Sequence, residues 1–143
     1  MPHAVSPEGL ALLKRLEGFR AAPLALADGR WLNGYGHAQA NEPTESITEA
    51  AAEAALRADI APVEAALAER LLAPCTQPQF DALVSFAFSI GMEAFAKSDV
   101  LRRFNAGEPI AAACAMDAWR KSRVSGEPAV LDALVRRRAA LCF

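Results

Sequence analysis

The chain has little of what marks a secreted, disulfide-bonded or metal-binding protein. Its three cysteines, Cys75, Cys114 and Cys142, are widely spaced and form no metal-ligand pattern, which is typical of reduced, mostly buried thiols. The segment Met1–Ser6 has neither the charged nor the apolar region of a secretory signal. His37 has no metal-ligand partners nearby in the sequence and is predicted to be a buried hydrogen-bonding residue. We therefore expect a cytoplasmic protein without a structural disulfide, a metal site or a cofactor.

Long hydrophobic runs and an excess of positive charge are also absent. The longest apolar stretch, Leu83 to Met92, is interrupted by serines and falls well short of the ~20 residues of a membrane span. The formal net charge is −2, so no broad positive field draws the protein onto nucleic acid or anionic cell wall. The run Arg136–Arg138 is better suited to favourable placement of cations within a C-terminal helix and to ion pairs with other helices. Neither a membrane span nor a nucleic-acid partner is expected.

The beginning of the sequence indicates a helix followed by a small irregular lobe. Ser6-Pro7-Glu8 provides a cap, a first-turn proline and an early acid, and Leu12, Leu16 and Phe19 then recur at helical spacing. Residues 23–43 contain Pro, Gly, Asp and Asn without helical periodicity. We expect two or three short strands there, within a small cleft-forming lobe at about residues 20–60.

The rest of the chain is predicted to be helical. A capping box at Ser46–Glu49 begins a long alanine-rich helix with a kink or restart at Pro62. Thr76–Gln79 caps a buried central helix, which Gly91 ends. Shorter helices are expected at about residues 99–105 and 109–121, with a last helix from about residue 129. The chain stops inside an apolar helical pattern, so we expect one domain, residues 1–143, that forms the N-terminal part of a longer protein.

Glu17 is the candidate for acid chemistry. Glycoside hydrolysis usually requires one acid that protonates the leaving oxygen and a second carboxylate that activates water or attacks the sugar. The apolar sequence around Glu17 suits the acid, because an apolar setting penalises the ionised form of a carboxyl group. The alternative is a structural ion pair of Glu17 with Arg15, Arg20 or a distant arginine.

The order of motifs around Glu17 resembles the phage-type lysozymes, the endolysin muramidases with a T4-lysozyme-like fold. The resemblance begins with a helix that ends in Glu17–Arg20, continues through Gly29 and Trp31, and reaches Gly34–His37. It implies a mainly α (α+β) fold, with a helical bundle lobe and a small lobe joined by a long helix. Further matching blocks follow to the end of the chain: residues 47–50, 79–86, 90–91, Trp119 and 134–138.

The resemblance also implies an active site that this sequence no longer has. In the family, a glutamate is followed by an aspartate and a threonine that hold and activate the attacking water. Without gaps, these positions fall on Glu17, Leu26 and Leu32. Rescue by Asp28 would need a remodelled loop, because in an extended segment it lies roughly 6–7 Å beyond Leu26 and it reads as a turn residue. Asn33 points to the opposite face from Leu32. The chemistry therefore looks removed.

Two functions remain open on the sequence. One is an active peptidoglycan-cleaving lysozyme with Glu17 as general acid. The other is a non-catalytic domain in which Leu24, Leu26 and Leu32 line an apolar groove that contacts a protein. The alternative is that these leucines only fill and close the former cleft, without binding a partner.

A more specific resemblance favours the second function. Several blocks are similar to the muramidase-like N-terminal domain of the SpmX polar localisation proteins of stalked alphaproteobacteria. That resemblance implies self-association, contact with a polar scaffold protein, recruitment of a histidine kinase, and tethering at the inner membrane or cell pole through segments absent from this chain. Residual binding of peptidoglycan is a further expectation. The blocks that carry the resemblance are residues 104–107, 112–116, 119–121 and 132–140.

Overall fold

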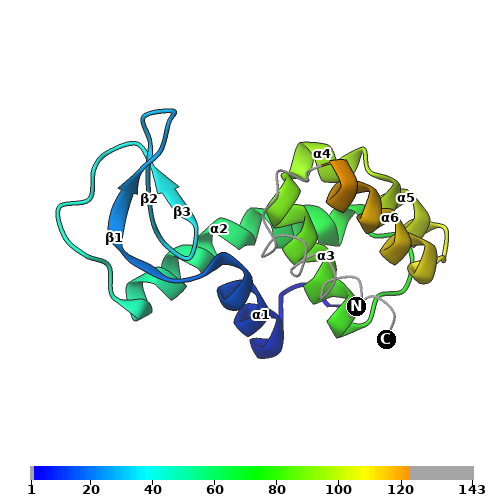
Figure 1. Ribbon diagram of the computed structural model, residues 1–143. Helices are drawn as coiled ribbons and strands as arrows, with labels where there is room; N and C mark the ends of the chain where they lie inside the picture. Colours follow the sequence, from blue (N-terminus) through cyan, green and yellow to red (C-terminus); the bar gives the residue numbers. More distant parts are fainter. Residues whose placement is uncertain (1, 123–143) are drawn as a thin grey trace. The chain divides into compact units, whose positions relative to one another are not determined.

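The computed structural model describes residues 2–122 (Figure 1). The described part of the chain is mostly helical and contains one three-stranded antiparallel sheet, as predicted. The predicted last helix, Arg136–Arg138 and Cys142 lie outside the described residues. The elements are α1 (Pro7–Glu17), β1 (Arg20–Ala25), β2 (Trp31–Gly34), β3 (His37–Gln39), α2 (Glu49–Arg70), α3 (Gln77–Ile90), α4 (Met92–Ala96), α5 (Asp99–Asn105) and α6 (Pro109–Ser122).

The chain divides into two compact units. We call residues 11–62 the sheet unit, and residues 1–10 together with 63–143 the helical unit. The chain passes from one unit to the other twice, once inside α1 and once inside α2. Helix α2 continues through Pro62, where the sequence predicted a kink or restart, and the boundary between the units follows this proline.

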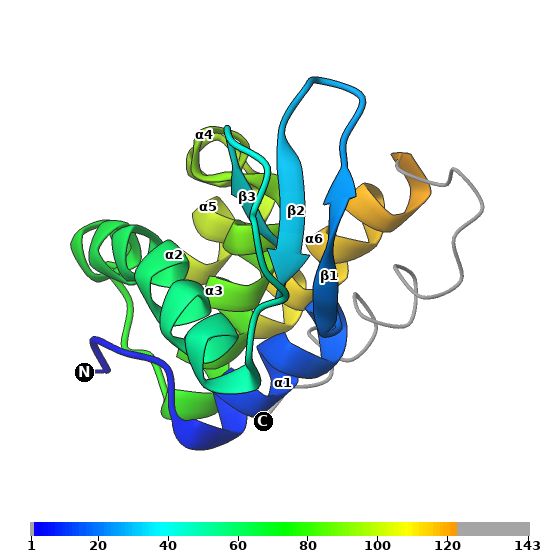
Figure 2. The same ribbon diagram turned by 90° about the vertical axis from the view of Figure 1, so that its left-hand side faces the viewer.

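The sheet of the sheet unit has β2 at its centre, between β1 and β3 (Figure 2). Leu32 in β2 is paired with Leu24 in β1 and with Ala38 in β3. Directly paired residues of antiparallel strands share a face of the sheet, so these three residues form one apolar row. The turn between β1 and β2 closes with hydrogen bonds that join Leu26 N–H to Arg30 O and Gly29 N–H to Leu26 O.

Helix α2 begins at Glu49, and the residue that caps it differs from the prediction. The Thr48 hydroxyl accepts a hydrogen bond from Ala51 N–H, whereas the sequence assigned the cap to Ser46. The preceding loop is attached to the sheet by a hydrogen bond from Ile47 N–H to Ala21 O. The core of the sheet unit is made of buried side chains, namely Leu13, Tyr35, Ala52, Leu56 and Ile60.

The helical unit is built around α3, as predicted. Thr76 and Gln79 form the capping box that begins the helix, and Gly91 ends it with a φ of 93°. Phe86 of α3 packs edge-on against Phe95 of α4, with ring centroids 6.2 Å apart. The short helix α4 was not predicted, because five residues are too few to show helical periodicity.

The two described cysteines occupy different environments. Cys75 is half-buried, and burial is the main cause that raises the pKa of its thiol to about 11. Cys114 in α6 is exposed. The expectation of mostly buried thiols is therefore wrong for Cys114, which lies on the solvent side of an alanine-rich helix.

Candidate functional site

Glu17 lies in a cavity of about 330 Å³ within the sheet unit. Helix α1 ends at Glu17 because Gly18 adopts a positive φ of 74°, while its N–H still bonds to Lys14 O. The turn places the chain so that α1, β1 and β2 contribute to one concave surface. The residues that line this cavity are Glu17, Gly18, Phe19, Arg20, Leu32, Gly34 and Gly36.

The turn between β2 and β3 lies directly against the Glu17 carboxyl group. A Cβ atom on Gly36 would be 2.9 Å from Glu17 Oε2, and Gly36 has a φ of 73°. The backbone conformation favours glycine, and a side chain at Gly36 would have to push the end of the Glu17 side chain aside. The Gly-Tyr-Gly-His motif, found in the sequence as a landmark, therefore forms the wall against which the glutamate is held.

Leu32 is the one predicted leucine that lines the cavity with Glu17. Leu24 shares its face of the sheet and is 40% exposed. Leu26 follows β1 at the start of the turn and is not part of the cavity lining. The structure thus brings Glu17 and Leu32 together, and extends the apolar surface of Leu32 towards Leu24.

Asp28 is engaged as a turn residue. Its carboxylate accepts hydrogen bonds from Arg30 N–H at 3.0 Å and from Arg30 Nε at 2.7 Å. These bonds lower the pKa of Asp28 from its ordinary value of 3.8, and the bond from the backbone N–H has the largest effect. Asp28 is not among the residues that line the Glu17 cavity. Glu17 is therefore the only carboxylate in the lining, within the part of the chain that the structure describes.

Asn33 is buried, 4% exposed, as expected for a residue whose side chain points away from the face that carries Leu32. Within the described residues, its Oδ1 atom has no hydrogen-bond partner. His37 of β3 is the residue paired with Asn33 across the two strands, and it bonds through Nδ1 to Asp59 Oδ2 at 2.8 Å. His37 makes the predicted hydrogen bond, but its side chain is only partly buried.

A polar and aromatic network adjoins the cavity through Phe19, and no sequence pattern indicated it. Phe19, which lines the cavity and is 46% exposed, packs on buried Tyr35 with ring centroids 5.5 Å apart. The Lys14 ammonium lies 5.5 Å from the centre of the Tyr35 ring and is paired with Glu53. The Tyr35 hydroxyl donates to Glu49 Oε1 at 3.3 Å. No local signal links Lys14 with Glu53, which are 39 residues apart.

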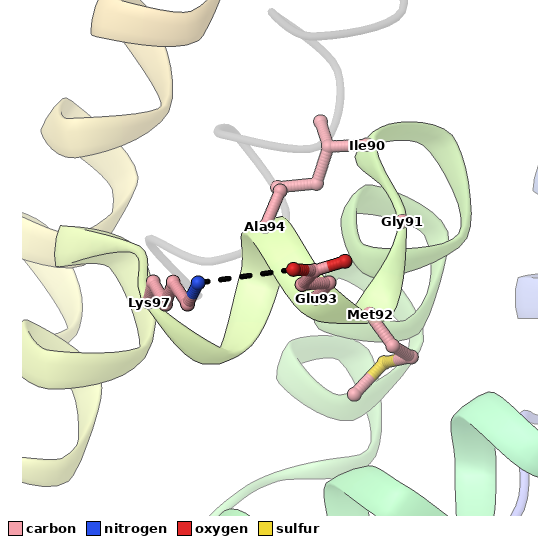
Figure 3. A pocket seen from close by; sticks show the side chains of 6 residues that line it. All are labelled: Ile90, Gly91, Met92, Glu93, Ala94 and Lys97. Carbon is pink, nitrogen blue, oxygen red and sulfur yellow. Dashed lines mark ion pairs between the residues drawn. The ribbon is translucent and has the colours of Figure 1, made fainter.

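A second surface hollow of about 510 Å³ lies in the helical unit, where α3 meets α4 (Figure 3). Among the described residues that line it, Glu93 is the one acid, and it is paired with Lys97 one helical turn later at 3.8 Å. This exposed i,i+4 pair is typical of a solvated helix surface. The hollow therefore lacks the pair of carboxylates that glycoside chemistry requires.

Residues 2–122 show neither a metal-binding cluster nor a membrane-spanning helix. They contain no group of three or more His, Cys, Asp or Glu residues arranged to hold a metal ion. None of their helices combines the length and the apolar character needed to cross a membrane.

Comparison with known proteins extends the match over almost the whole chain. The family model for phage lysozyme matches residues 14–140. An endolysin of Acyrthosiphon pisum secondary endosymbiont phage 1 is 41% identical over 136 residues, which are 95% of this chain and 93% of that protein. The predicted resemblance to phage-type lysozymes is confirmed.

Solved structures show the same fold. The muramidase domain of SpmX from Asticaccaulis excentricus has a TM-score of 0.84 and 46% identity, and the match covers 98% of this chain and 95% of that domain. A variant of P22 lysozyme has a TM-score of 0.82 and 32% identity, with 97% of this chain and 98% of that chain covered. The predicted T4-lysozyme-like fold and the resemblance to the SpmX domain are both confirmed. The chain belongs to the phage lysozyme family.

Proposed function

We propose that this lysozyme-fold domain does not hydrolyse peptidoglycan and acts as a protein-interaction and self-association module. The observation that carries the proposal is the presence of Leu32 in the cavity beside Glu17. A leucine side chain has no atom that can orient a water molecule or accept its proton. General-base assistance typically contributes about 10²–10⁴-fold to a rate, so its loss slows by a similar factor the water attack that protonation by Glu17 would complement.

The exposed apolar residues of the sheet unit support a binding role. Phe19 is 46% exposed at the cavity, and Leu24 is 40% exposed beside Leu32 on the sheet. Contiguous apolar surface of this kind commonly marks a protein contact. Leu32 and Leu24, with Phe19, are therefore the surface we assign to the interaction, and Leu26 belongs to the adjoining turn.

The similarity to the SpmX muramidase domain extends the proposal to partners. We include contact with a polar scaffold protein and recruitment of a histidine kinase, in the cytoplasm at the inner membrane or cell pole. Residual binding of peptidoglycan without cleavage is compatible with this role, because Glu17 and its cavity are retained.

The alternative function is that of an active muramidase with Glu17 as general acid. It is favoured by the 41% identity to a phage endolysin and by the position of Glu17 in a cavity. The two functions differ in one measurable product, soluble muropeptides.

The deciding experiment incubates the purified 143-residue protein with peptidoglycan sacculi and follows muropeptide release by chromatography. P22 lysozyme serves as the positive control. We expect no release from the parent protein or from Glu17→Gln. Release by the parent protein that disappears in Glu17→Gln would overturn the proposal in favour of the muramidase.

Self-association is tested separately by light scattering over a range of protein concentrations. We expect a rise in mean mass that Leu24→Ser reduces. Leu72→Ser is the matched control, because Leu72 is an exposed leucine of the helical unit, 81% exposed, outside the assigned surface. A protein that stays monomeric at every concentration would contradict the self-association part of the proposal.

A further inference from the structure

The segment that precedes α1 is bonded to two distant helices, α2 and α3, at residues that belong to the helical unit. Val5 N–H donates to Glu64 Oε2 of α2 at 2.7 Å, and Ser6 N–H donates to Asp81 Oδ1 of α3 at 2.9 Å. Gln77 of α3 donates from Nε2 to Ala4 O at 2.9 Å. Three consecutive residues are therefore fixed by side chains that lie 59 to 75 positions away.

Asp81 is the centre of these contacts. Its carboxyl group is buried, 7% exposed, and accepts from Ser6 N–H, from the Ser6 hydroxyl and from Gln77 Nε2. The Ser6 hydroxyl also accepts from Gly9 N–H at 3.0 Å and so caps α1. One serine thus connects the first turn of α1 to the buried carboxylate of α3. Hydrogen bonds to a charged group in a setting of low dielectric are stronger than those on the surface.

The packing around Asp81 leaves no spare room. A Cβ atom on Gly9 would lie 2.7 Å from each of the two carboxylate oxygens. Gly9 is buried within α1, where glycine costs helix stability relative to alanine. The absence of a side chain lets the first turn of α1 lie directly on the Asp81 carboxylate.

We propose that residues 4–9 form a latch, closed by Asp81, which opens and closes as one unit while the remaining helices of the helical unit stay folded. The closed latch fixes the first turn of α1, the helix whose last residue is Glu17. Opening releases this turn and exposes the Asp81 carboxylate. The latch lies at the end of α1 opposite Glu17, and its opening is independent of whether the protein hydrolyses glycan.

A simple helix cap makes a different prediction from a latch. If Ser6 only caps α1, loss of Asp81 affects the groups that Asp81 touches and no others. If residues 4–9 open together, loss of Asp81 also releases Val5 N–H, whose acceptor is Glu64 and not Asp81. Val5 N–H is therefore the reporter that separates the two.

The test is native-state hydrogen exchange on the full 143-residue protein, read at the amides of Val5, Ser6 and Gly9. We expect Asp81→Asn to speed exchange of the Val5 amide about tenfold or more, since hydrogen bonds to charged groups are lost from a cooperative unit. Glu64→Gln is expected to have the reciprocal effect on Ser6 and Gly9. The amides in the centre of α3 are expected to keep their slower exchange.

Two further variants complete the design. Ser98→Ala is the matched control, since Ser98 caps α5 with the same chemistry and its hydroxyl bonds to Phe95 O and Leu101 N–H within its own segment. It is expected to leave exchange of the Val5 amide unchanged. If Asp81→Asn does not fold, Gln77→Leu takes its place in the same exchange measurement. Gln77 is only partly buried, and its replacement removes the hydrogen bonds to Ala4 and to Asp81. Unchanged exchange at Val5 would overturn the latch. Exchange of α3 in step with residues 4–9 would also overturn it.

Discussion

At the scale of single residues, Gly36 lies close to the carboxyl group of the retained acid, Glu17. A side chain at Gly36 would press on the carboxylate, and the positive φ penalises any residue other than glycine. Gly29 offers a matched comparison, because its φ is 87° but a Cβ atom there would meet nothing within 4 Å. A comparison of the same substitution at Gly29 and at Gly36 therefore separates the cost of backbone strain from the cost of contact with Glu17.

We predict that Gly29→Ala lowers the free energy of unfolding by about 1–2 kcal/mol through strain alone. Gly36→Ala is expected to cost about 1–3 kcal/mol more, the usual range for overpacking. Urea denaturation of both variants measures the difference. Equal losses would mean that the Glu17 carboxylate moves aside without cost.

Lys14 and Glu53 provide a prediction that depends on pH. Lys14 donates a hydrogen bond to Glu53, which lowers the pKa of Glu53 from its ordinary value of 4.5 and raises that of Lys14 above 10.5. A lowered carboxyl pKa adds stability above the unfolded value, and this is lost as the pH falls through the folded value. A raised lysine pKa adds stability below 10.5 that is lost as the pH rises through the folded value.

We therefore predict that Glu53→Gln melts about 1–3 °C below the parent protein at neutral pH. The difference is expected to shrink as the pH falls below 4.5. Thermal melts from acid to neutral pH provide the measurement. Glu93→Gln is the control, because Glu93 forms an exposed pair with Lys97 and is expected to change little at any pH. If the melting temperature of Glu53→Gln stays equally far below that of the parent protein at low pH, Glu53 stabilises the fold by packing and not by its charge.

At the scale of elements, the start of α2 shows how a local motif can be read two residues out of place. Ser46 and Thr48 both precede a helix-forming run, and Ser46 with Glu49 has the spacing of a capping box. The loop bond from Ile47 N–H to Ala21 O holds this segment against β1, so the helix begins later. A contact with a distant strand therefore selects between two caps that the local sequence leaves almost equivalent.

We predict that Thr48→Ala lowers the free energy of unfolding by about 1 kcal/mol, the typical cost of a lost cap. Ser46→Ala is expected to stay within about 0.5 kcal/mol, as for most exposed substitutions. Chemical denaturation of the two variants measures both values. A larger loss for Ser46→Ala would show that the cap alternates.

At the scale of the whole molecule, the net charge of −2 sets an expectation for cell-wall binding. Any attachment to anionic sacculi must rely on local contacts, because no broad positive field exists to be screened. We predict that the amount of protein that pellets with sacculi changes little between about 50 and about 300 mM salt. A steep fall with salt would reveal a concentrated basic surface.

Most of the fold was predictable because its signals are local or ordered along the chain. The Thr76 capping box, the Gly91 stop and the Gly34–His37 motif all lie where the sequence placed them. At the site, only the family resemblance pointed to Leu32 as an active-site position, and in the structure Glu17 and Leu32 line one cavity. The network of Tyr35, Lys14 and Glu53 was not predictable, because its members come from separate elements and meet only through tertiary packing.

The contrast between the two described cysteines has a practical consequence. With a pKa of about 11, the Cys75 thiol is ionised in only about one molecule in a thousand at pH 8. Alkylating reagents attack thiolates, and Cys114 is open to solvent. Of these two positions, maleimide dyes should therefore mark Cys114 first, which offers an attachment point on α6 for fluorescence measurements of assembly without changing the sheet unit.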